Sequence, residues 1–226
     1  MQHIIYKSIF VIETLVFLST VVISMIYRRN KKLDPIRFFL LESIVGLVAT
    51  AIVPHTKSGA LYYYMSYNLI TFLDLAVLHY YFWSLLTRRL LRRTLLIGFT
   101  FITGISLYFF ASPRFGLTVF MPILYGIQNL FITLPCLLYF YELFNSEEET
   151  DLRINPHFYI ACAVLFFYGA TFPFFMAFKT LYDATPEMIV LLSSVENLLI
   201  IVMDFTFMKA FFCPYPIQYS PLSQVE

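Results

Sequence analysis

Charged residues are scarce in this chain, and no segment between its apolar stretches is long enough to form a soluble domain. Of the 226 residues only 13% are charged, whereas 60% are hydrophobic. Soluble domains carry about 25% charged residues, so the composition excludes an ordinary soluble protein. It also leaves no room for a kinase, nucleotide-binding or DNA-binding domain. A net charge of +1 provides no bulk field that would attract nucleic acid, and we expect no such partner.

Cysteine and glycine are also scarce. The three cysteines, Cys136, Cys162 and Cys213, lie inside apolar stretches or at the end of one, and none belongs to a C-x-x-C motif. This pattern predicts no disulfide framework, no metal site and no cofactor. Seven glycines without a G-x-x-x-G pair predict helices that pack mainly through bulky side chains. The first apolar stretch lacks the basic start and the cleavage site of a signal peptide, so we expect a retained helix.

Seven long apolar stretches fill the chain almost from end to end. A helix needs about 20 apolar residues to cross a hydrocarbon core about 30 Å thick. The sequence therefore predicts an all-α polytopic membrane protein, with a single seven-helix domain over residues 1–213 and a short cytoplasmic tail over 214–226. The predicted spans cover residues 6–26, 36–53, 61–86, 94–111, 117–144, 157–181 and 188–212.

Basic residues in the short connections predict the orientation of the bundle. Two connections on one side carry most of them: Arg28, Arg29, Lys31, Lys32 and Arg37 after the first span, and Arg88, Arg89, Arg92 and Arg93 after the third. The connections on the other side hold Lys57, Arg114 and little else. Because basic loops stay in the cytoplasm, we expect the N-terminus outside and the C-terminus inside. The expected location is the inner (cytoplasmic) membrane, with membrane lipids as partners.

Three prolines fall within predicted spans, Pro122 and Pro135 in the fifth and Pro173 in the sixth. A proline inside a helix removes one backbone hydrogen bond and bends the helix at that point. We therefore expect kinks in the fifth and sixth helices.

Acids and amides lie inside the predicted spans, where each is costly and each is a candidate for function. One group lies roughly 10 to 18 Å from the outer ends of the four helices that run inward, at 1.5 Å per residue. This predicted outer polar layer consists of Glu13, Asn68, Gln128, Asn129, Glu196 and Asn197. It is interpreted either as hydrogen bonding between helices or as a ligand-binding pocket open to the outside.

A second group lies deeper and is expected to couple the outer layer to the cytoplasmic side. This predicted inner cluster consists of Glu42, Asp74, His79 and Asp204. No lysine or arginine lies at the same depth to neutralise these acids. His79 follows Asp74 by five residues, so the two do not share one helix face. We expect His79 to form hydrogen bonds rather than to bind a metal, and we assign no catalytic residue.

The third, fifth and seventh spans share a short local pattern. It reads Tyr67-Asn68-Leu69, Gln128-Asn129-Leu130 and Glu196-Asn197-Leu198. The pattern indicates either a coincidence in leucine-rich helices or a parallel repeat, in which the last three spans echo the first three.

The sixth span resembles a feature of small bacterial seven-helix membrane proteins. From Leu152 to Phe175 it reads LRINPHFYIACAVLFFYGATFPFF, with an N-P-x-[FY]-[WY] start and an aromatic middle that contains a glycine. The matching positions are Asn155, Pro156, Phe158, Tyr159, Tyr168 and Gly169. The run ENLLIIVMDFTF from Glu196 and the run YNLITFLDLAVLHYYFWSLL from Tyr67 resemble the seventh and third helices of those proteins. The resemblance implies a seven-helix, N-outside bundle, similar to stand-alone proteins and to the sensory inputs of bacterial signalling proteins. It implies no particular ligand.

Three functions agree with these features. The favoured one is a small receptor-like or accessory sensory bundle, in which the outer polar layer binds a small or lipidic molecule or senses protonation. Its cytoplasmic loops would then contact a signalling partner in the cytoplasm or membrane. The alternative is a small-solute or proton-coupled transporter, because acids without basic partners suit cation coupling. The third is a lipid-modifying enzyme that uses the inner cluster for acid–base chemistry, although the sequence favours a protein that is not an enzyme.

Overall fold

The computed structural model describes residues 2–27, 30–52, 57–112, 116–119, 121–146, 151–182 and 186–214. Within these ranges the fold is all-helical. The elements are α1 (Gln2–Ile26), the 3-10 helix η1 (Lys31–Leu33), α2 (Asp34–Ile52), α3 (Lys57–Leu85), α4 (Arg89–Ala111), α5 (Pro122–Phe144), α6 (Pro156–Tyr182) and α7 (Pro186–Phe212). The basic residues Arg28, Arg29 and Arg114, the side chain of Lys57 and the tail beyond residue 214 lie outside what the structure describes.

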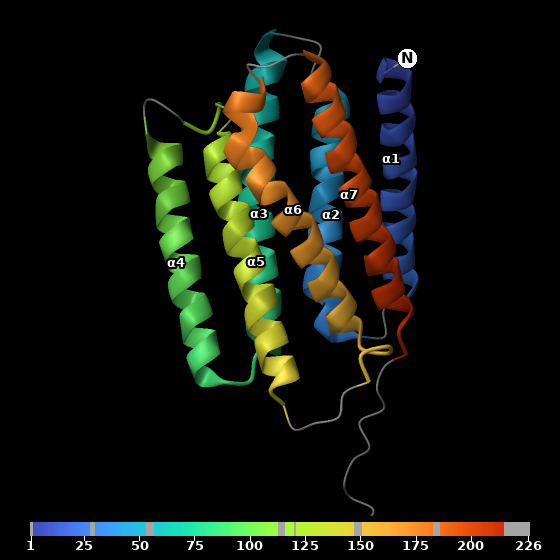
Figure 1. The fold of residues 1–226 in the computed structure, drawn as a ribbon, viewed down its shortest axis with the longest axis vertical. Helices are drawn as coiled ribbons and strands as arrows, with labels where there is room; N and C mark the ends of the chain where they lie inside the picture. Colours follow the sequence, from blue (N-terminus) through green and yellow to red (C-terminus); the bar gives the residue numbers. More distant parts are fainter. Residues whose placement is uncertain are drawn as a thin grey trace, which may run out of the picture.

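The helices stand side by side in one bundle, and consecutive helices run in opposite directions (Figure 1). Each helix packs against the next one in the sequence, and α7 packs against α1, so the helices form a closed ring in chain order. α3 also packs against α5. The contact between α5 and α6 is extensive, whereas α1 and α2 touch over a short stretch. The first three and the last three helices therefore do not pack alike, which favours coincidence over a parallel repeat as the origin of the shared local pattern.

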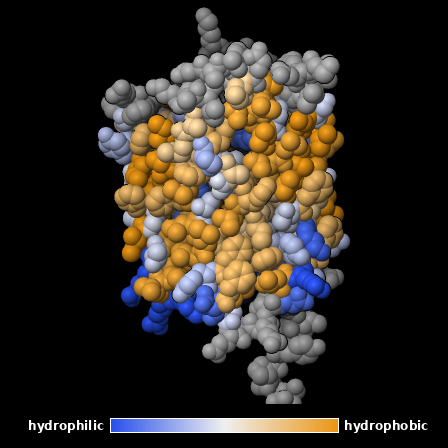
Figure 2. All heavy atoms as spheres, in the orientation of Figure 1, coloured by the Kyte–Doolittle hydropathy of each residue, from blue (hydrophilic) through white to orange (hydrophobic). Residues whose placement is uncertain are grey.

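The helices present an apolar surface to their surroundings. Among the described residues, five segments are long and apolar enough to cross a membrane: Ser8–Ile26, Arg89–Ala111, Pro122–Phe144, Pro156–Ala177 and Val190–Phe212. Large hydrophobic side chains such as Leu15, Ile97 and Leu191 are exposed on them. Figure 2 shows a broad hydrophobic belt over the visible face and hydrophilic residues gathered at its lower end. This is the surface of an integral membrane protein that crosses the bilayer several times.

The described helices begin and end within a few residues of the predicted spans, and the start of α5 shows why one boundary differs. The segment before α5 turns at Gly116, whose φ of 69° is a left-handed conformation that glycine adopts without strain. As a result α5 begins at Pro122 rather than at residue 117. A proline in the first turn sacrifices no helical hydrogen bond, so the prediction that Pro122 kinks a helix is wrong. Pro135 and Pro173 do lie inside α5 and α6.

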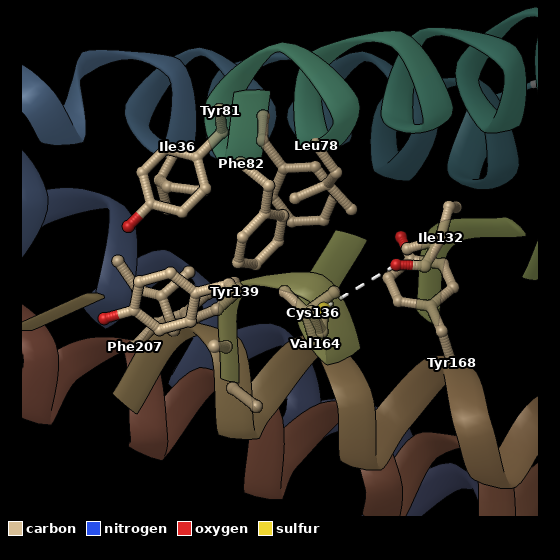
Figure 3. Close-up of a cluster of buried hydrophobic side chains, with 14 of the residues drawn as sticks. Ile36, Leu78, Tyr81, Phe82, Ile132, Cys136, Tyr139, Val164, Tyr168 and Phe207 are labelled. Carbon is tan, nitrogen blue, oxygen red and sulfur yellow. Dashed lines mark hydrogen bonds between the residues drawn. The ribbon is translucent and has the colours of Figure 1, made fainter. Parts of the chain in front are cut away.

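An apolar core fills the lower half of the bundle in Figure 1, the half toward which α1, α3, α5 and α7 run. Most core residues lie within roughly twelve residues, or about 18 Å, of the lower helix ends. Tyr81, Phe82, Tyr139 and Phe207, from α3, α5 and α7, belong to this core together with Cys136 (Figure 3). These aromatic side chains close the lower half of the bundle.

Candidate functional site

Asn68 of α3 forms hydrogen bonds to the segment that precedes α5. Its side-chain nitrogen donates to the carbonyl oxygens of Leu117 and, at 3.2 Å, Val119. Its side-chain oxygen accepts a hydrogen bond from the hydroxyl of Tyr125. Asn68 is only 1% exposed, and its amide is fully engaged. It is therefore a structural link between α3, α5 and the turn before α5, which supports the hydrogen-bonding interpretation of the outer polar layer at this residue.

Gln128 and Asn129 of α5 form hydrogen bonds to the helices on either side of it. Gln128 Nε2 donates to the hydroxyl of Ser106 on α4 at 3.0 Å, and Asn129 Nδ2 donates to the hydroxyl of Thr171 on α6 at 3.0 Å. Adjacent residues of a helix point in directions about 100° apart, which is why neighbours in sequence reach different helices. These contacts support the interpretation of the amides as interhelical hydrogen bonding, worth about 0.6 kcal/mol each.

Glu13, Glu196 and Asp204 form a separate acidic group between α1 and α7. Glu13 lies close enough to both of the other carboxyl groups to interact with them electrostatically. Asp204 is 1% exposed, and its Oδ2, like Oε2 of Glu13, has no hydrogen-bond partner among the described residues. The side-chain nitrogen of Asn197 is buried and also lacks one in that part of the chain. We call Glu13, Glu196 and Asp204 the α1–α7 acid group.

Glu42 of α2 and Asp74 of α3 lie together near the middle of the bundle. Their carboxyl groups are within hydrogen-bonding reach of each other. The hydroxyl of Tyr168 on α6 donates to Oδ2 of Asp74 at 3.5 Å. No donor from the described residues reaches either carboxyl oxygen of Glu42 or Oδ1 of Asp74. This contact, which we call the carboxyl pair, joins two members of the predicted inner cluster.

His79 faces α4 instead of the carboxyl pair. Its Nδ1 lies 2.8 Å from the carbonyl oxygen of Leu75, and its ring centroid lies 5.3 Å from that of Phe99. A carbonyl only accepts, so Nδ1 is assigned the proton and Nε2 keeps a lone pair. That Nε2 is buried without a partner in the described structure. The structure thus separates His79 from Glu42 and Asp74, and it places Asp204 with Glu13, so the four predicted residues do not form one cluster.

No basic side chain that the structure describes neutralises these buried acids. Within the described ranges, Arg37 and Asp34 form the only ion pair, and it lies at the lower end of the bundle. In the same ranges, no three histidine, cysteine or acidic side chains are placed to hold a metal ion. The chemistry open to the five carboxyl groups is therefore the exchange of protons or the binding of a small cation by pairs of carboxylates.

Arg37 has a structural role that the sequence does not reveal. From the sequence it counts only as one of the basic residues that set orientation. The guanidinium is buried and donates to the carbonyl oxygens of Ser24, Tyr27 and Asn30, each at 3.0 Å. The last carbonyls of a helix have no partner within it. Arg37 supplies that partner at the end of α1, and no local sequence signal indicates this.

The Asn-Pro motif of the sixth span is a helix cap. Asn155 Oδ1 accepts from the backbone N–H groups of His157 at 2.9 Å and Phe158 at 3.3 Å, while Pro156 opens α6. His157 Nδ1 in turn lies 2.8 Å from the hydroxyl of Tyr81 on α3. The N-cap signal could be identified from the sequence, whereas the contact with Tyr81 could not.

Glu142, near the end of α5, performs a similar task for α4. Its Oε1 accepts from the backbone N–H groups of Thr87 at 2.8 Å and Arg88 at 3.1 Å, just before α4 begins. The residue at the start of α4 provides no cap of its own. A distant carboxylate therefore replaces the local cap, and sequence reasoning missed it.

Comparisons of the chain with protein-family models, with curated proteins and with solved structures find no match. The resemblance to bacterial seven-helix proteins stays a prediction, and the site must be interpreted from its own geometry.

Proposed function

We propose that this chain is a seven-span, receptor-like membrane protein, with its N-terminus outside, that responds to protons or a small cation at buried carboxyl groups. The observation that supports it is the presence of five such groups without a basic partner in the described part of the chain: Glu13, Glu42, Asp74, Glu196 and Asp204. An ionised carboxylate within a bilayer costs several kcal/mol. Uptake of a proton or cation removes that cost, so occupancy of these groups favours one packing of the helices over another.

The amides of the predicted outer layer support this assignment by exclusion. Asn68, Gln128 and Asn129 are bonded to other helices or to the turn before α5. They hold the bundle together, although Oε1 of Gln128 has no hydrogen-bond partner among the described residues. The unsatisfied polar atoms instead belong mainly to carboxyl groups. The proposed ligand site therefore moves from the outer amides to the acids.

The packing of the lower half favours a receptor over a carrier. A carrier must open a path to each side of the membrane in turn. Here aromatic side chains, among them Tyr81, Phe82 and Phe207, fill the half predicted to face the cytoplasm. A change at the carboxyl groups can shift these packed helices without opening them. Transport remains the second candidate, because unpaired acids are also what a proton-coupled carrier requires.

Cysteine labelling tests the proposed orientation. In a C136A/C162A background, Cys213 near the end of α7 reports the cytoplasmic side, and Thr118→Cys before α5 reports the outside. A membrane-impermeant maleimide should label Thr118→Cys in intact cells, and should label Cys213 only after the membrane is permeabilised. The opposite pattern would reverse the orientation and with it the proposed direction of signalling.

The response itself can be followed through the single tryptophan, Trp83, which lies near the lower end of α3 with the guanidinium of Arg92 at 5.2 Å from its ring. In proteoliposomes, a pH step or an added alkali cation should change Trp83 fluorescence while an internal pH dye reports no proton flux. A variant with all five acids changed to amides should lose this change. Asp151→Asn, in the exposed α5–α6 connection, is the control and should keep it.

The outcomes of this experiment are distinct. Solute-dependent or proton flux would establish transport in place of sensing. A wild-type protein whose fluorescence ignores both pH and cations would overturn the proposal, as would a five-amide variant that responds like the wild type.

A further inference from the structure

We propose that Glu42 and Asp74 bind one exchangeable proton between them, and that this shared proton holds α2 against α3. The inference rests on the proposed function and names its ligand and its site. It assigns a distinct role to the carboxyl pair, separate from that of the α1–α7 acid group.

The geometry requires a positive charge between the two side chains. Glu42 and Asp74 come from different helices, and their carboxyl groups lie within hydrogen-bonding reach of each other. Two ionised carboxylates in contact repel each other, whereas one proton converts the same contact into a hydrogen bond. No donor from the described residues reaches Oε1 or Oε2 of Glu42 or Oδ1 of Asp74. The proton is therefore the group that completes the contact.

The burial of Glu42 points independently to an occupant. This side chain is only 8% exposed, so it is more than nine-tenths buried, and neither of its oxygens has a protein donor in the described structure. Arg37, the only basic residue of α2, is already committed to three carbonyl oxygens at the end of α1. Glu42 therefore has no cation of its own, and its side chain is directed at Asp74.

Tyr168 links the carboxyl pair to α6. Its hydroxyl donates to Oδ2 of Asp74 at 3.5 Å, and its side chain is 4% exposed. The titratable groups that act on the pair are the two carboxyl groups on each other and Tyr168, which is itself influenced by Tyr67 of α3. Loss of the proton would drive Glu42 away from Asp74 and strengthen the bond from Tyr168 to the charged carboxylate. α3 would then exchange a contact with α2 for a tighter contact with α6.

Infrared spectroscopy detects the proton directly. The full chain in lipid should show a protonated-carboxyl band at neutral pH that disappears at alkaline pH. Glu42→Gln and Asp74→Asn should each remove the component of this band that belongs to the pair, because an amide can donate to the remaining carboxylate and replaces the shared proton. Glu13→Gln, in the α1–α7 acid group, is the matched control and should leave that component in place. A band that neither pair variant reduces would overturn the inference.

A distance measurement tests whether the shared proton holds α2 against α3. Nitroxide labels at Leu41→Cys on α2 and Leu73→Cys on α3, both 41% exposed, would be introduced into a chain whose native cysteines are replaced. The distance between labels should increase at alkaline pH in the wild-type background. In the E42Q/D74N double variant it should stay at the shorter value at every pH, because two amides can hydrogen-bond without a proton. If the distance between the labels increased at alkaline pH in E42Q/D74N as it does in the wild type, the role of the shared proton in holding α2 against α3 would be refuted.

Sodium distinguishes the proton from a metal cation, with choline as the control ion. Loss of the pair's carboxyl band on addition of sodium at constant pH, without the same loss in choline, would assign the pair to a metal cation and overturn the inference. The two proposals also fail separately. A pair-dependent band with no Trp83 response would sustain the shared proton and refute the sensing function. A Trp83 response that survives in E42Q/D74N would sustain sensing and refute the role of the pair.

Discussion

Replacing Arg37 should destabilise the bundle far more than replacing any exposed basic residue. The guanidinium is 3% exposed and donates to three backbone carbonyl oxygens that lie at or beyond the end of α1. Its ion pair with Asp34 adds little, because the Asp34 side chain is 60% exposed. Removal of one member of a buried charged network typically costs about 3 to 5 kcal/mol. We expect about 4 kcal/mol for Arg37→Met.

Arg37→Lys distinguishes the contribution of the guanidinium's hydrogen-bonding geometry from that of its positive charge. Lysine keeps the positive charge but lacks the planar fork that reaches several acceptors at once, so we expect a loss of about 2 kcal/mol. The assay is reversible unfolding in mixed micelles, followed by circular dichroism. Arg93→Met, which removes an exposed charge from α4, is the control and should change stability by less than about 0.5 kcal/mol. Equal losses in Arg37→Met and Arg93→Met would refute the capping role, and so would full stability of Arg37→Lys.

Three further sets of substitutions test the contacts between helices. A Cβ on Gly126 would lie 2.8 Å from Sδ and 3.3 Å from the backbone nitrogen of Met176, so Gly126→Ala should lower the free energy of unfolding by about 1 to 3 kcal/mol. Adding Met176→Ala should recover part of this loss in the same unfolding assay. If it recovers none, the strain does not come from the contact with Met176. Asn68→Ala should lower the free energy of unfolding by about 2 kcal/mol and Tyr125→Phe by about 1 kcal/mol, because the first removes every hydrogen bond of the Asn68 amide and the second removes one of them. Equal losses would contradict the role of Asn68 as a link between α3, α5 and the turn before α5. Glu142→Ala should cost about 1 kcal/mol and expose the connection before α4 to proteolysis, whereas Glu142→Gln, which keeps an acceptor oxygen, should protect it.

The positions of the helices could be predicted because their signal is local. A long apolar run determines a membrane-crossing helix whatever its neighbours are. The boundary of α5 was harder, since both Pro122 and the residues before it are apolar enough to continue a span. What ends the pattern there is the left-handed turn at Gly116, and seven glycines offered no reason to single out that one.

The partners of the polar side chains could not be predicted, because they depend on how the helices are arranged around the ring. Depth along a helix indicates which residues can meet, but not which face each one presents. Gln128 and Asn129 have nearly the same depth and bond to different helices. Arg37 is a stronger case. Its sequence context is that of an ordinary basic connection, yet its side chain turns inward and caps a helix that ended ten residues or more before it.

The polar residues of the bundle divide by chemistry rather than by depth. An amide or hydroxyl both donates and accepts, so it can satisfy itself on a neighbouring helix, as Asn129 does with Thr171. A carboxylate only accepts, and a helix offers few free donors to it because its backbone N–H groups are already bonded. Carboxyl groups in a bundle without basic partners therefore remain unsatisfied unless a proton or a cation joins them. Glu42 and Asp74 meet this condition within hydrogen-bonding reach of each other, whereas the acids of α1 and α7 are spread along their interface. For that reason the carboxyl pair, and not the larger acid group, is the place where one bound proton can change how two helices pack.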